Sequence, residues 1–181
     1  MKEKKNQGSL TLEACIVVPI FLMVMLLANG LFIMFMGQQV MSHAMLQTAK
    51  SMAFDPYGAQ KANTDGSPAL MPLFMDLFTL GDSAYSSTDD WTDGGNVPKE
   101  AEERFYAFLG GKSKANSYAI LDVVGVKGGA AGVKFTDSSY DKDTGILTVS
   151  MSYEQEFIFN AMGLLSFPRT LTVQIPVLQY K

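Results

Sequence analysis

The sequence predicts an α+β fold, with one long amino-terminal helix followed by a small domain of short helices and a carboxyl-terminal antiparallel sheet. Three patterns lead to this prediction. Residues 14–36 are mostly apolar and contain no charge, and the residues that follow carry apolar side chains at helical spacing. Near the carboxyl end, residues 146–153 and 171–177 alternate between apolar and polar side chains, as strands with one buried face do.

A short basic segment, residues 1–8, precedes the apolar run and contains Lys2, Lys4 and Lys5. The 23 residues from 14 to 36 would form a helix of about 34 Å, long enough to cross a bilayer once. Positive charges near a span favour the cytoplasmic side. We therefore expect a single-pass protein of the cytoplasmic membrane, with its amino terminus inside and an extracytoplasmic domain, residues 55–181, outside.

The predicted helix continues past the membrane, so that residues 9–54 form a transmembrane half and an amphipathic half. One face of the second half is marked at helical spacing by Met41, Met45, Thr48 and Met52. The sequence Asp55-Pro56-Tyr57-Gly58 predicts the end of the helix, because proline disfavours helical backbone in the residue before it.

The middle of the chain alternates between short apolar and polar segments. Residues 69–80 are apolar but too short for a second span. Residues 83–96 are predicted to be a polar loop. Pro98 then suits the first turn of an amphipathic helix, which Gly110-Gly111 would end.

The acidic residues Asp89, Asp93 and Glu100 occupy the first, fifth and twelfth places of a weak calcium-loop candidate. Trp91 stands where a third ligand is needed, and Asn96 stands where an apolar side chain is usual. A solvated acidic loop without a metal is the favoured interpretation.

The carboxyl-terminal part is predicted to form the sheet. Residues 113–131 fit either a helix or a strand. Residues 133–140 and 146–153 read as two strands of a hairpin around Asp141-Lys142-Asp143-Thr144-Gly145. Residues 171–177 contain Pro176, which predicts an edge or bulged strand.

Composition argues against an enzyme, a nucleic-acid-binding protein and a cofactor-binding protein. The net charge is −4, without a basic stripe, and the only cysteine, Cys15, lies in the predicted span. The only histidine, His43, lies on the predicted helix, so a His-dependent catalytic triad in the outer domain is excluded. We expect no catalysis and no cofactor.

Gly8, Ser9 and Glu13 form the one ordered motif of the chain, at the boundary between the basic segment and the apolar run. Glu13 is the fifth residue counted from Ser9. This order resembles the processing site of type IV prepilins, in which a membrane peptidase cuts after the glycine. The run Gly8-Ser9-Leu10-Thr11-Leu12-Glu13, continued through Pro19 to Leu22, is similar to the opening of TadE-like proteins, pilin-like subunits of tight-adherence (Flp) pilus systems.

The resemblance implies a minor pilin or pseudopilin that loses residues 1–8 and takes part in pilus assembly and secretion. Its implied partners are a prepilin peptidase, other pilin-like subunits and the Tad membrane platform, and its implied destination includes a surface pilus. Pro19 would kink or loosen the span, although ordinary helix curvature fits equally well. The alternative is an uncleaved single-span protein whose outer domain binds a surface ligand or a protein partner.

Overall fold

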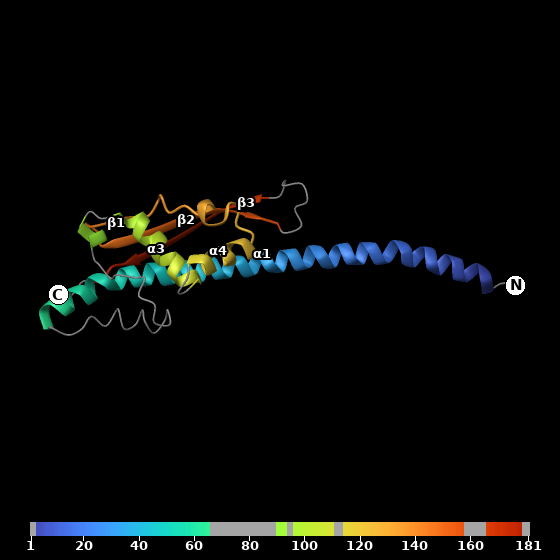
Figure 1. Ribbon diagram of the computed structural model, residues 1–181, viewed down its shortest axis with the longest axis horizontal. Coiled ribbons are helices and arrows are strands. Elements are labelled where there is room, and N and C mark those ends of the chain that lie inside the picture. Colours follow the sequence, from blue (N-terminus) through green and yellow to red (C-terminus); the bar gives the residue numbers. More distant parts are fainter. Residues whose placement is uncertain (1–2, 66–89, 94–95, 111–113, 158–165, 179–181) are drawn as a thin grey trace.

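The computed structural model describes residues 3–65, 90–93, 96–110, 114–157 and 166–178. It confirms the α+β class. Helix α1 (Glu3–Asp65) runs the length of the molecule, and the other described elements lie against its carboxyl-terminal half (Figure 1). The amino-terminal half of α1 projects from this domain on its own.

Helix α1 extends beyond both of its predicted ends. It continues through Asp55-Pro56, so the prediction that it stops near residue 54 is wrong. A proline within a helix disturbs the hydrogen bonds of the preceding turn. Here the carbonyl oxygen of Ala53 accepts a hydrogen bond of 3.0 Å from the backbone N–H of Leu178, which follows the last strand. The carbonyl that loses its helical donor to Pro56 is that of Met52, four residues earlier. The bond to Ala53 joins the adjacent residue of α1 to the chain after β3.

Two further helices follow: the first packs against α1, and the second packs against the first. The helix predicted from Pro98 is confirmed as α3 (Val97–Gly110), which buries Ala101, Phe105 and Leu109. The ambiguous segment after it contains α4 (Lys114–Val123). Short 3-10 helices, η1 (Asp90–Asp93) and η2 (Gly129–Gly132), precede α3 and follow α4. The predicted segment 69–80 and residue Asp89 lie outside the described residues.

The described sheet has the strand order β1-β2-β3 and is antiparallel throughout. Its strands are β1 (Ser139–Asp141), β2 (Ile146–Glu156) and β3 (Ser166–Pro176). Ile146 pairs with Pro176 at one end and Glu156 with Ser166 at the other. Pro176 thus ends β3, which is an edge strand of the described sheet, as predicted.

The predicted hairpin is present, although its first strand is much shorter than residues 133–140. Asp141 organises the turn by accepting hydrogen bonds from the Asp143 N–H and the Thr144 hydroxyl, and Gly145 supplies the positive φ of 67°. Before β1, the hydroxyl of Ser138 bonds to both the N–H and the carbonyl of Ser150. This side chain takes the place of backbone pairing and interrupts the strand.

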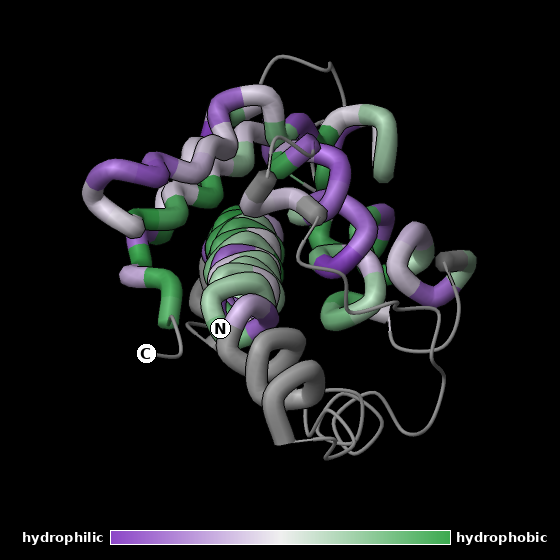
Figure 2. The backbone as a smooth tube through the Cα atoms, turned by 90° about the vertical axis from the view of Figure 1, so that its left-hand side faces the viewer, coloured by the Kyte–Doolittle hydropathy of each residue, from purple (hydrophilic) through white to green (hydrophobic). Residues whose placement is uncertain are grey.

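The core lies between the outer half of α1, the inner face of the sheet, and α3. The predicted helical stripe is confirmed, because its members are all fully buried: Met41, Met45, Thr48 and Met52. The sheet contributes the apolar face predicted for β2, namely Leu147, Val149, Met151 and Tyr153. Figure 2 looks nearly along α1 and shows the sheet and the short helices on different sides of it. One helix is therefore both the projection and the centre of the core.

Candidate functional site

The most unusual surface of the molecule is the amino-terminal part of α1. Every residue from 12 to 29 is exposed, including large apolar side chains on all sides of the helix. These 18 residues rise about 27 Å. An apolar surface of this extent marks contact with a membrane or with partner helices. By length and composition, α1 is able to cross a bilayer once.

The motif residues all lie on this projecting part of α1. Gly8 and Ser9 are within the helix, and Glu13 is exposed beside Leu12. About 7.5 Å of helix separates Gly8 from Glu13 along the axis. Among the side chains that the structure describes, which begin at Leu12, none forms an ion pair with the Glu13 carboxyl group.

Pro19 is also within α1, and the helix continues through it without a break. Figure 1 shows a smooth, gently curved helix in this region. A proline is tolerated inside a spanning helix when neighbouring groups satisfy the freed carbonyl.

Gly30 is the first buried residue of α1 after the exposed run, and the close approach of α1 to the domain is seen at Gly37. A Cβ on Gly37 would come within 2.8 Å of the Val124 Cβ and 3.0 Å of the Gln155 Nε2. Gln155 is buried in β2, and its side-chain amide donates to the carbonyls of Met34 and Val124, each at 3.1 Å. Gly37 allows α1 to approach the sheet closely. Gln155 links β2 to Met34, near the outer end of the apolar segment.

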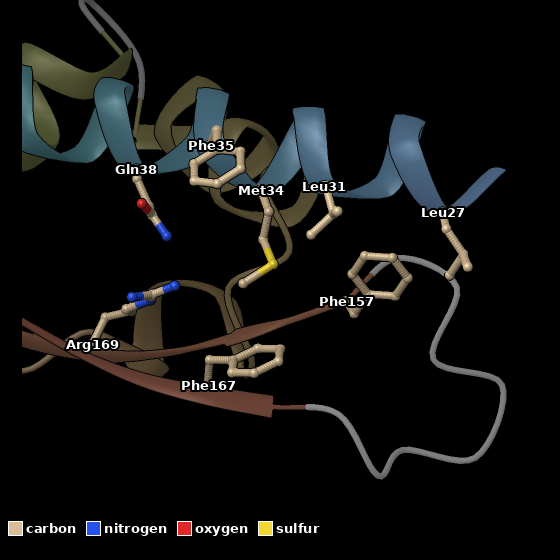
Figure 3. Close-up of a pocket in the computed structure, with 8 residues that line it drawn as sticks. All are labelled: Leu27, Leu31, Met34, Phe35, Gln38, Phe157, Phe167 and Arg169. Atoms are coloured by element: carbon tan, nitrogen blue, oxygen red, sulfur yellow. The ribbon is translucent and has the colours of Figure 1, made fainter. Parts of the chain in front are cut away.

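A pocket of about 440 Å³ lies beside this attachment, between α1 and the ends of β2 and β3 (Figure 3). Apolar side chains line most of it, and Gln38 and Arg169 are its polar members. Arg169 lies on the inner face of β3 by strand alternation, between Phe167 and Leu171. Its Nε is buried without a hydrogen-bond partner in the described structure. Arg169 is not among the residues predicted from the sequence, although an arginine in an alternating apolar series is a signal.

A second polar group lies deep in the core, where α1, α3 and η1 meet. Arg104 is fully buried and forms ion pairs with Asp55 and, at 2.8 Å, with Glu100. The indole N–H of Trp91 donates to Asp55 at 3.4 Å. Burial lowers the pKa of Arg104 to about 10, an effect that the charge of Asp55 opposes. The guanidinium therefore stays protonated at neutral pH.

The sequence contained a signal for this ion pair as well. Asp55 continues the spacing of the buried stripe that ends at Met52, and Arg104 shares the inner face of α3 with Ala101 and Phe105. A carboxylate on one apolar face and a guanidinium on another are expected to meet, since buried charges are paired.

The calcium-loop candidate gains no support from the structure. Glu100 lies in the first turn of α3 and is paired with Arg104. Asp93 ends η1, and Asp89 is outside the described residues. Over the described ranges, no three His, Cys, Asp or Glu side chains are grouped to hold a metal ion.

Comparisons with protein-family models, curated proteins and solved structures find no match. The resemblance to TadE-like proteins stays a prediction carried by the residues around Gly8 and Glu13. Apart from these residues, the described structure shows an exposed apolar helix with a folded domain on its outer half.

Proposed function

We propose that this chain is a structural subunit of the pilin-like class, a minor pilin or pseudopilin of a Tad-type pilus or related secretion apparatus. In this role it is cut after Gly8, held in the cytoplasmic membrane by α1, and assembled through contacts between helices. It acts by packing, and we assign it no catalysis.

The observation that carries this proposal is the division of α1 into two halves. Residues 12–29 are exposed on every side, whereas one face of the outer half of the same helix is buried in the core. A continuous helix of this kind presents one apolar surface that suits both lipid and a bundle of identical helices. A subunit that moves from a membrane into a fibre needs both contacts.

The charge pattern supplies the orientation. Lys2, Lys4 and Lys5 precede the span, which favours a cytoplasmic amino terminus and an outer domain. A prepilin peptidase would act at the inner boundary. Gly8 lies in the first turns of α1, so the peptidase has to unwind the helix there, and glycine is the residue whose helical conformation is weakest apart from proline.

The test is the mass of the intact chain, extracted from membranes of cells that also express a prepilin peptidase. We expect a chain that begins at Ser9. Gly8→Asp should retain residues 1–8, because its side chain blocks the close approach of a protease to the backbone. Asn6→Asp introduces the same charge two residues away and should still be processed.

An unprocessed wild-type chain beside a demonstrably active peptidase would contradict the proposal. That outcome would favour an uncleaved single-span protein whose outer domain binds a surface ligand or a protein partner.

A further inference from the structure

We propose that the pocket between α1 and the β2–β3 end of the sheet binds a phospholipid of the outer leaflet, with the phosphate against Arg169 and an acyl chain along α1. The inference rests on the membrane insertion of α1 that the proposed function includes. It does not depend on processing or on assembly into a fibre.

The pocket has an apolar end and a polar end, and these are separated along the axis of α1. Leu27 and Leu31 line the end nearer the amino terminus of α1, together with Phe157 from the end of β2. Gln38 and Arg169 line the other end (Figure 3). The rise from Leu27 to Gln38 is about 16 Å. A ligand that fits this gradient has a long apolar part and a polar head.

The position of this gradient matches the membrane boundary. A hydrocarbon core of about 30 Å that begins near Ala14 spans about 20 residues of helix and ends near Met34. Leu27 and Leu31 are then at the depth of the acyl chains. Gln38 lies about 6 Å beyond Met34, at the depth of the headgroups.

The charge of the pocket specifies the head of the ligand. Arg169 points from β3 into the space facing α1 (Figure 3), and its Nε has no hydrogen-bond partner in the described part of the chain. None of the pocket-lining residues is acidic. Arg169 is partly exposed, but its Nε is buried, and a buried N–H without a partner is costly. The planar guanidinium also suits phosphate oxygens. Basic pockets beside spanning helices bind lipid headgroups for this reason.

The same charge argues against a second copy of this chain as the occupant. The apolar helix of another copy, residues 14–36, carries no anion to pair with Arg169. A phospholipid supplies both the apolar chain and the phosphate.

The experiment uses the full chain in phosphatidylcholine nanodiscs that contain a trace of phosphatidylglycerol with a photoreactive acyl chain. Cross-linked residues are identified by mass spectrometry of peptides. We expect labelling concentrated on Phe157, Phe167 and the facing side of α1. Photoreactive diacylglycerol with the same acyl chain lacks the phosphate and should label these residues about tenfold less, the loss expected for one charge-assisted contact.

Arg169→Gln should lower phosphatidylglycerol labelling to the diacylglycerol level. The control Lys142→Gln removes an equal charge from the hairpin turn at the far end of the sheet and should leave labelling unchanged. Unfolding midpoints establish that both variants fold. If Arg169→Gln does not fold, the comparison of the two lipids in the wild-type chain still shows whether the phosphate contributes to binding.

Three outcomes would overturn the proposal: labelling spread evenly along residues 12–29, equal labelling by the two lipids, or cross-linked dimers through the pocket. Each of these can occur while the chain is processed normally at Gly8. Conversely, an unprocessed chain that shows the expected labelling would contradict the pilin-like role and leave the lipid site intact.

Discussion

Arg104 and Asp55 face each other in a part of the core that holds few other polar groups. Both side chains are almost completely withdrawn from water, and Glu100 and Trp91 contribute further contacts. Removing two charges from water costs several kcal/mol, which their attraction offsets only when the geometry is good. The ion pair therefore contributes more to the choice of packing between α1 and α3 than to net stability.

The buried ion pair between Arg104 and Asp55 can be tested by removing one or both charges. Arg104→Met should lower the free energy of unfolding by about 3–5 kcal/mol, because it leaves the carboxylate of Asp55 buried beside an apolar side chain. The double variant Arg104→Met/Asp55→Leu should lose much less. Urea titration of the full chain in detergent micelles measures both, with fluorescence from Trp91, the single tryptophan. Equal losses in the two variants would contradict the coupling.

Among the elements, α1 has the most demanding packing, since its two halves lie in different surroundings. The outer half is held by apolar burial, by Gln155 and by the contact of the Ala53 carbonyl with Leu178. The inner half is helical, although no other described part of the protein covers it. Its length and apolar surface suit a membrane, where all backbone groups must be satisfied within the segment.

Gly37 tests how closely α1 and the sheet must approach. Gly37→Val should lower the free energy of unfolding by about 1–3 kcal/mol, since its Cβ has no room beside Val124 and Gln155. Ser42→Val places the same side chain on an exposed position of the same helix and should change the urea midpoint little. Equal urea midpoints for Gly37→Val and Ser42→Val would show that the contact between α1 and the sheet accommodates the larger side chain.

The elements that local sequence could predict are those with a strong period. The methionine stripe, the helix after Pro98 and the strand from Ile146 each have one, whereas the apolar run is recognised by its length, and all four are present. The end of α1 could not be predicted from Pro56, because the contacts of α1 with α3 and the sheet join residues far apart in the chain. The interruption before β1 likewise depends on the partner that Ser138 finds in another strand.

The candidate site was predictable to a different degree. Its exposed apolar helix and its motif residues lie close together in the sequence, so both could be proposed from the sequence alone. The pocket at Arg169 and the ion pair at Arg104 join residues far apart in the chain. Their individual signals, a charge within an apolar face, become interpretable only when the facing element is known.

At the scale of the whole molecule, the proposed assembly depends on a carboxylate that the monomer leaves without a described partner. In a stack of subunits, Glu13 would meet the new amino group of Ser9 from a neighbour, in surroundings of low dielectric constant. The pair would set the axial register, because a buried carboxylate without a partner is unfavourable.

Glu13→Ala should therefore permit cleavage after Gly8 but reduce incorporation into surface fibres by about a hundredfold, the consequence of leaving a buried amine unpaired. Glu13→Asp retains the charge and should recover part of the incorporation. Immunoblots of sheared fibres and of the membrane fraction measure the two steps separately. Normal incorporation of the alanine variant would exclude the pairing.

The continuity of α1 also has a mechanical consequence. A tensile load applied to the projecting half runs straight into the domain along the helix axis. There it acts in shear on two distant attachments at once, the Gln155 amide at Met34 and the Leu178 amide at Ala53. Such an arrangement resists pulling better than one in which contacts peel apart singly, so the domain should stay folded while its helix is drawn out of a bilayer.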